Sequence, residues 1–415
     1  MTVFSPEGVS RIVPPQYQNI RNIAAQVKLL LMPRITATSP ELPVMQACRR
    51  VCEQIATPLA GGLRRRVVSG LAALAFAVSG LGATAAQSSS IPDDALGLAV
   101  GFDALRWKDS LDLRAELADY AAMGVRWLRT DLNWATIQQG GPDSFDWSEM
   151  DRVVDLARAY DIKVLPVAGS TPEWAWQNPE RPSPPRDAEA FGRFLRVAVA
   201  RYSTRGIDTW EIWNEPNLEG PFPPQPDARE FARILKAANA SIKAADPDAT
   251  VILGGLAAVV ETNLSGDPLV VSATDFLETV YAEGAGDSFD ALGFHPYTGA
   301  DLPDLNASGN SWAMMAGPIR DIMTAHGDET KKIWITEYGA PTNRDGGGVS
   351  PERQAELMRA SVELARATPW IGPLFWYSYR DLGTDPTDRE NWFGLMTTDG
   401  DAKPARSALE GLVAR

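Results

Sequence analysis

The sequence predicts a (β/α)8 barrel from Leu96 onward, because short apolar strands alternate there with amphipathic helical stretches at intervals of about 40 residues. Each expected strand is an apolar run bounded by polar or turn-forming residues. The expected strands are Gly97–Phe102, Val125–Thr130, Lys163–Val167, Thr209–Trp213, Thr250–Leu253, Ala291–Phe294, Lys332–Thr336 and Leu374–Tyr377. Eight strands suffice to close such a barrel, so we expect residues 87–415 to form one domain.

The stretches between these strands carry apolar residues at helical spacing. In one of them Phe231, Ile234 and Leu235 recur three and four residues apart, and in another Ser350 and Pro351 make a good N-cap and first-turn pair. The expected helices are Ser148–Tyr160, Asp187–Tyr202, Ala228–Ala245, Pro351–Ala367 and a last one over Pro404–Val413.

The first 86 residues differ from this pattern. Residues 1–62 show no periodic run, and we expect a disordered extension or a stretch upstream of the true start codon. Residues 63–86 then join Arg64–Arg66 to an apolar stretch ending in the small residues Ala83–Ala85, which is typical of a secretory signal peptide. If it is not cleaved, this segment would be a membrane anchor. We therefore expect a secreted or periplasmic protein.

Charge and composition exclude several classes of function. Residues 1–86 hold nine Lys/Arg and three Asp/Glu, so the remaining 30 and 50 leave a net charge of −20, which argues against nucleic-acid binding. Both cysteines, Cys48 and Cys52, lie in the first 86 residues, and His295 and His326 are the only histidines of the sequence. A zinc centre needs more such ligands, and we expect no metal and no cofactor.

The motif W-E-I-W-N-E-P-N, residues 210–217, ends the fourth expected strand. Pro216 cannot continue a strand ladder, so Asn214 and Glu215 are expected at the tip. A carboxyl group flanked by Trp210 and Trp213 would lie in partly dry surroundings, which favour a proton donor.

The motif K-K-I-W-I-T-E-Y-G-A-P-T, residues 331–342, ends the seventh expected strand with Glu337 at its tip. On such barrels the chemistry takes place at the C-terminal ends of the strands. Two carboxylic acids at one rim are what glycoside hydrolysis requires, one to protonate the leaving oxygen and one to attack or to activate water.

Together with W-F-G-L-M…D-G…K-P-A near the C-terminus, these motifs resemble the clan A retaining glycoside hydrolases, and are most similar to family 39 and its bacterial exopolysaccharide-cleaving members. The resemblance covers roughly Leu96 to Val413. It implies that Glu215 is the acid/base, that Glu337 is the nucleophile and that Arg129 holds the nucleophile ionised. Some family 39 enzymes carry an added β-sandwich, which we do not expect after the last helix.

Other strand tips offer further candidates. At the second, Arg126 is expected to be structural, whereas Asp131 would contact substrate or pair with Arg129. At the third, Trp174 and Trp176 would form sugar platforms or pack in the core.

At the sixth tip, His295 and Tyr297 lie two residues apart and project from one face. The resemblance implies hydrogen bonds from this tip to the nucleophile or the substrate, with Tyr297 favoured. Trp376 on the eighth strand resembles the aromatic floor under the sugar, with Tyr377 as the alternative. Glu211, deeper in the fourth strand, is expected to be a buried partner for a basic group.

The predicted function is that of a retaining β-glycosidase acting through a covalent glycosyl-enzyme, in which Asn214 binds the sugar 2-hydroxyl. The 13 Trp, 9 Tyr and 13 Phe suit an oligo- or polysaccharide as partner, with membrane contact only through an uncleaved N-terminal segment. A non-catalytic carbohydrate-binding barrel that assists polysaccharide assembly or export is the alternative, but it would not need both carboxylates. A barrel metallohydrolase would need His and Asp clusters at the strand tips.

Overall fold

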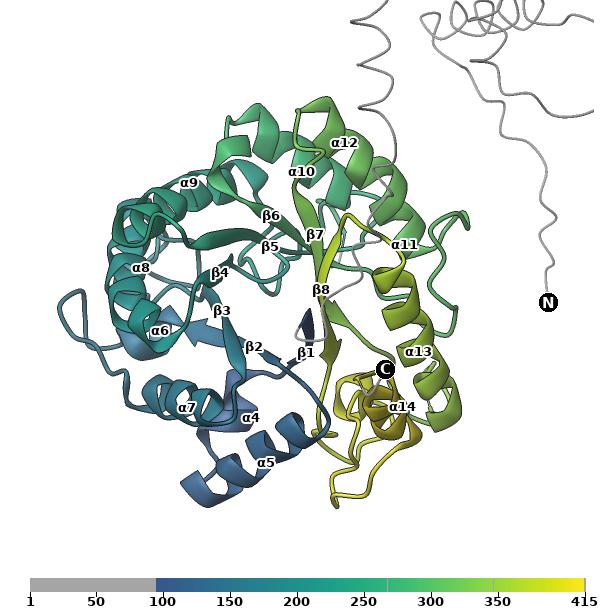
Figure 1. Cartoon of the computed structure of the whole chain (residues 1–415). Helices are drawn as coiled ribbons and strands as arrows, with labels where there is room; N and C mark the ends of the chain where they lie inside the picture. The colour runs from purple at the N-terminus through teal and green to yellow at the C-terminus, as the bar shows by residue number, and fades with distance from the viewer. Residues whose placement is uncertain (1–94, 267, 346, 414–415) are drawn as a thin grey trace, which may run out of the picture. The chain divides into compact units, whose positions relative to one another are not determined.

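The computed structural model describes residues 95–266, 268–345 and 347–413, and these contain a closed barrel of eight parallel strands in sequence order (Figure 1). The strands are β1 (Leu96–Ala99), β2 (Trp127–Asn133), β3 (Lys163–Gly169), β4 (Thr209–Ile212), β5 (Thr250–Ala257), β6 (Ala291–His295), β7 (Lys332–Tyr338) and β8 (Ile371–Tyr377). The predicted barrel and all eight strands are confirmed. The expected extension and the signal or anchor segment lie outside the described residues.

Helices surround the barrel (Figure 1). They are α4 (Phe102–Arg106), α5 (Ser110–Ala122), α6 (Trp134–Ile137), α7 (Ser148–Ala159), α8 (Ala188–Tyr202), α9 (Ala228–Ala245), α10 (Ala273–Ala282), α11 (Ser311–Met314), α12 (Arg320–Ala325), α13 (Pro351–Arg366) and α14 (Pro404–Val413). The five expected helices are confirmed, while α4, α5, α6, α10, α11 and α12 were not among those predicted. Within the part of the chain that the structure describes, no helix combines the length and apolarity needed to cross a membrane.

The core has two apolar layers. The larger one lies between the barrel and its helices, and the smaller one fills the barrel interior with side chains such as Trp127, Leu165 and Phe375. Because side chains alternate along a strand, Arg129 projects from β2 on the same interior face as Trp127, one step closer to the C-terminal mouth. The barrel interior therefore changes from apolar to polar along β2.

Lys403, the lysine of K-P-A in the C-terminal motif, forms a buried ion pair with Asp381. The Lys403 ammonium, directly before α14, lies 2.7 Å from Asp381 Oδ1 and 2.8 Å from Thr342 Oγ1, and its side chain is only 7% exposed. It also donates to the Trp392 carbonyl at 3.2 Å. The pair thus joins the segments that follow β7 and β8 to the start of α14.

We predict that Lys403→Ala destabilises the domain by about 3–5 kcal/mol, because it leaves the Asp381 carboxylate buried without its partner. Urea unfolding followed by tryptophan fluorescence measures this change. Arg193→Ala is the matched control, since it breaks an ion pair with Asp187 in which both side chains are more than half exposed (67% and 51%) and should change stability little. Equal effects of the two substitutions would contradict the role given to Lys403.

Candidate active site

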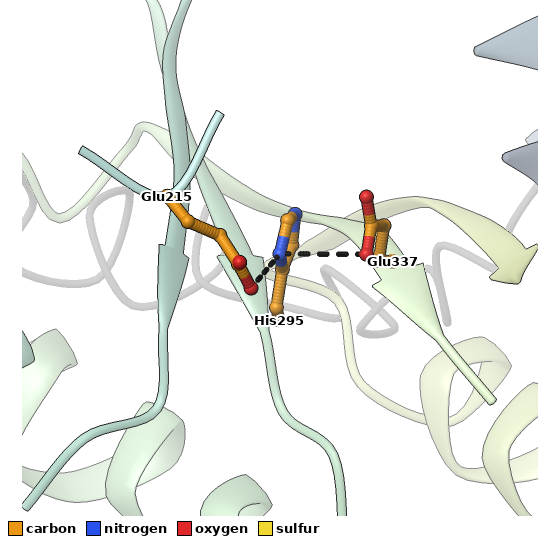
Figure 2. Close-up of side chains that lie close together, drawn as sticks. All are labelled: Glu215, His295 and Glu337. Carbon is orange, nitrogen blue, oxygen red and sulfur yellow. Dashed lines mark hydrogen bonds and ion pairs between the residues drawn. The ribbon is translucent and has the colours of Figure 1, made fainter. Parts of the chain in front are cut away.

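Glu215 and Glu337 face each other across the mouth of the barrel with the His295 ring between them (Figure 2). His295 Nδ1 lies 2.9 Å from Glu215 Oε1 and 3.8 Å from Glu337 Oε2, and one oxygen of each carboxylate lies within 4.8 Å of the other. A retaining mechanism requires carboxyl groups about 5–5.5 Å apart, whereas an inverting one needs about 6.5–9.5 Å for a water molecule. The observed spacing agrees with the shorter range.

The backbone at the tip of β4 is held in an uncommon conformation. Trp213 has φ 71° and Glu215 has φ 41°, a region that few residues with a side chain adopt. The Glu215 N–H donates to the Gly255 carbonyl on β5 at 3.0 Å. This contact fixes the turn that directs the Glu215 side chain over the mouth.

Two consecutive glycines on β5, Gly254 and Gly255, make this arrangement sterically feasible. A Cβ on Gly254 would lie 2.3 Å from the carbonyl oxygen of Trp213, and one on Gly255 would lie 2.0 Å from His295 Nε2. The β5–β6 register also shifts between Leu253 and Leu256. Neither glycine was predicted as a site residue, although Gly-Gly inside a strand signals a bulge or a close backbone approach.

Arg129 connects the polar side chains of the mouth. Its guanidinium binds Glu211 through Nε at 2.7 Å and Nη2 at 3.0 Å, and it binds Glu337 Oε1 through Nη1 at 2.6 Å. Glu211 is fully buried and also accepts the Gly255 N–H at 2.9 Å. The predicted contact of Arg129 with Glu337 is present, and Glu211 is confirmed as a buried partner for a basic group.

Asn214 is oriented by the same guanidinium. Its Oδ1 accepts from Arg129 Nη2 at 2.7 Å, and arginine has no acceptor atom, so the Asn214 amide nitrogen must face the other way. Asn214 lines the pocket beside Glu337, where this nitrogen is available as a donor.

The surroundings of Glu337 favour its ionised form. Burial alone would raise its pKa, but the charges of His295 (when protonated) and Arg129 and the hydrogen bonds from Tyr297 and Arg129 together hold the pKa of Glu337 below its usual value. The Tyr297 hydroxyl donates to Glu337 Oε2 at 2.9 Å. Both carboxylate oxygens therefore have a donor, and burial with the neighbouring carboxylates raises the pKa of Tyr297, which keeps it a donor.

Glu215, His295 and Glu337 are also the group whose spacing, among the described residues, would suit a metal ion. The fit is poor, because Glu337 already binds Arg129 and Tyr297, and the adjacent guanidinium charge opposes a second cation. The absence of a metal stays a prediction.

A pocket of about 130 Å³ opens beside Glu337, and Glu215 is not part of its wall. Residues from β1, β2, β7 and β8 and the tip of β4 form its wall. They are Ala99, Val100, Gly101, Arg129, Thr130, Asp131, Asn214, Glu337 and Tyr377.

Comparison with known proteins is consistent with this geometry. Residues 96–379 match the family model described as Cellulase (glycosyl hydrolase family 5). The chain belongs to this family. It is a clan A family, so the resemblance to the clan is confirmed, and the chain carries a glycoside hydrolase domain. No curated protein matches the sequence.

Solved structures of the same fold include members of family 39. One is a family 39 glycoside hydrolase from Bacteroides cellulosilyticus WH2, with 22% identity and a TM-score of 0.60. The match covers 79% of this chain and 64% of the Bacteroides chain. Another is a monomeric β-xylosidase from Caulobacter crescentus CB15 (20% identity, TM-score 0.60, covering 78% of this chain and 69% of that one). A third is xylanase 10B from Thermotoga petrophila RKU-1 (15% identity, TM-score 0.53, covering 80% and 95%).

The aromatic floor predicted for this glycosyl hydrolase is wrong at Trp376. That ring is fully buried and packs against Tyr338 at 5.8 Å in the layer between barrel and helices. Strand alternation instead places Tyr377 in the pocket wall. Trp210 and Trp213 also pack into the outer apolar layer, so the walls expected around Glu215 are not formed by them.

For two further candidates, Trp174 and Asp131, the sequence left two roles open. Trp174 packs edge-on against Trp134 at 5.7 Å and donates to the Gln138 carbonyl, and it is not part of the pocket wall. A platform role for Trp174 stays a prediction. Asp131 lines the pocket and accepts the Phe102 N–H at 3.0 Å, while the ion pairs of Arg129 that the structure describes go to other carboxylates.

We predict that Tyr297→Phe raises the pKa of Glu337, because the ionised form loses a hydrogen bond that the protonated form needs less. A hydrogen bond to a charged group is worth about 1.5–3 kcal/mol, so the acidic limb of the pH profile of kcat/KM should move upward by about one pH unit or more. Tyr338→Phe is the control, because its hydroxyl bonds Thr298 and not Glu337. An unmoved acidic limb in Tyr297→Phe would contradict this account of Glu337.

Proposed function

We propose that the chain is a retaining β-glycosidase that hydrolyses β-glycosidic bonds in an oligo- or polysaccharide by double displacement. The observation that carries this proposal is the pair Glu215 and Glu337. One oxygen of each lies within 4.8 Å of the other, and Arg129 forms an ion pair with Glu337 but not with Glu215. A carbohydrate-binding barrel without catalysis would have no use for this asymmetry.

In the first step a Glu337 oxygen forms a bond to the anomeric carbon as the bond to the leaving oxygen breaks. Glu215 gives its proton to that oxygen. In the second step water attacks the same carbon, Glu215 takes a proton from it, and Glu337 leaves as the carboxylate. The Asn214 amide nitrogen is available to donate to the sugar 2-hydroxyl, a contact that strengthens in the transition state.

His295 supports the acid/base cycle of Glu215. Its Nδ1 contacts Glu215 and its Nε2 lies 3.0 Å from the Thr336 hydroxyl, which can donate or accept. The imidazole therefore keeps a partner on both nitrogens whether Glu215 holds its proton or has given it up.

An exposed tryptophan follows the pocket-wall strand β1 and helix α4 in the chain. This residue, Trp107, is 75% exposed, with the Arg106 guanidinium 4.1 Å from its ring centroid. Arg152 donates to the carbonyls of Arg106 and Lys108 at 2.6 and 2.7 Å, which fixes the turn on both sides of the ring. A preordered aromatic face of this kind suits stacking against a sugar ring of a chain.

We predict that hydrolysis retains the β configuration, because the space between the two carboxylates is too small for an inverting water. A proton NMR time course on a β-linked oligosaccharide or aryl β-glycoside should show the β-anomer first and the α-anomer only through later mutarotation. Initial α product would contradict the mechanism, and absence of turnover on all β-linked substrates would favour the binding barrel.

The two carboxylates should respond differently to removal. Glu337→Ala should abolish turnover of every substrate, and azide should restore cleavage with an α-glycosyl azide as product. Glu215→Ala should lower the rate of hydrolysis of natural substrates by about 10²–10⁴-fold, because their leaving groups need protonation. On aryl glycosides with good leaving groups the glycosylation rate should change little. Azide should then yield a β-glycosyl azide from these substrates.

Glu173→Ala is the control for these variants, since this glutamate is exposed on the same rim and outside the pocket wall. Equal losses for Glu215→Ala and Glu337→Ala on both substrate types would contradict the division of roles.

A further inference from the structure

The pocket beside Glu337 has an unbalanced negative charge. Of the described residues in its wall, Arg129 is the cation, whereas Asp131 and Glu337 are carboxylates. Glu390 adds another carboxylate next to the wall, where the Tyr377 hydroxyl donates to it at 3.5 Å. A sugar that enters this pocket therefore meets mainly acceptors and negative charge.

Arg129 has little capacity left for a ligand. Its Nε and Nη2 bind Glu211, its Nη1 binds Glu337, and Nη2 also donates to Asn214. Two carboxylates share its single positive charge, so the cluster is already negative before Asp131 is counted. A carboxylate on the substrate would find no unpaired cation among the described residues of the wall.

Asp131 is held in place by one of its two carboxyl oxygens. Its Oδ2 accepts the Phe102 N–H at 3.0 Å, and its other oxygen makes no hydrogen bond within the described part of the chain. Its side chain is half-buried at the end of β2. Burial, with a contribution from the Glu337 charge, raises the pKa of Asp131 despite the Phe102 N–H and Arg129, so the pocket already disfavours a further negative charge.

We propose that Asp131 determines the specificity of the glycone pocket: its free carboxyl oxygen accepts a hydrogen bond from a hydroxyl group of a neutral sugar, and the pocket rejects uronic acids. This inference rests on the proposed glycosidase function and narrows its substrate class. The glycone enters this pocket because the pocket wall includes Glu337, whose oxygen bonds the anomeric carbon, and does not include Glu215, whose proton goes to the departing group.

The test compares pairs of aryl β-glycosides with one leaving group that differ only at C6: glucoside and glucuronide, galactoside and galacturonide, mannoside and mannuronide. For the configuration that the enzyme prefers, kcat/KM for the neutral sugar should exceed that for the uronide by about 100-fold or more, since opposed like charges are strongly unfavourable. Asp131→Asn should reduce this ratio at least about tenfold, with a gain on the uronide and a loss on the neutral sugar.

Asp103→Asn is the matched control, because it removes one carboxylate charge from the neighbouring helix α4 at a side chain that is 78% exposed. It should leave the ratio unchanged. In Asp131→Asn the amide oxygen of the new side chain can still accept the Phe102 N–H, and an unchanged unfolding midpoint would verify that the fold is kept.

A wild-type enzyme that cleaves a uronide as well as its neutral counterpart would overturn the inference, as would equal ratios in Asp131→Asn and in the wild type. Inactivity of the wild type on all six glycosides and on β-linked oligosaccharides would be a different result. It would overturn the proposed function itself, and the inference with it.

Discussion

The buried guanidinium of Arg129 imposes the constraint on which the rest of the site depends. A charge at the barrel mouth with 5% exposure must be matched by opposite charge and hydrogen bonds, or the fold loses stability. Glu211 supplies a bidentate partner from the fourth strand, and Glu337 supplies another from the seventh. The barrel thereby joins strands distant in sequence through one cation. The bonds that neutralise this cation also fix the position of Glu337, the proposed nucleophile.

The second constraint is backbone space around β5. Glu215 and His295 can approach each other only because Gly254 and Gly255 have no side chains, since a Cβ on either would lie 2.0–2.3 Å from atoms of the fourth or sixth strand. The Gly255 backbone meanwhile bonds both Glu211 and Glu215. The backbone of one glycine therefore bonds both the carboxylate that pairs with Arg129 and the tip of the fourth strand that carries Glu215.

Much of this arrangement could be predicted from the sequence, because it depends on strand ends. Apolar runs marked the eight strands, and the residues after them included both Glu215 and Glu337 and the Arg129 that binds one of them. Strand parity could not be predicted, since consecutive aromatic residues leave the inward face undefined. For this reason the sequence favours Trp376 as the aromatic floor, whereas Tyr377 lines the pocket in the structure. Helix α5 was also missed, as its many charged residues hide a helix whose start is capped by Asp109.

The two glutamates differ in environment in a way that separates their chemistry. Glu337 has a donor on each oxygen, and because its pKa is lowered, the bonds to its ionised form contribute stability at pH values above the ordinary carboxyl pKa. That contribution is lost as the pH falls through the lower pKa of the folded state. Glu215 instead contacts Nδ1 of His295, a ring nitrogen that donates or accepts a hydrogen bond according to the tautomer of the imidazole. A group fixed as an anion is suited to attack, and a group whose partner tolerates both protonation states is suited to deliver and recover a proton.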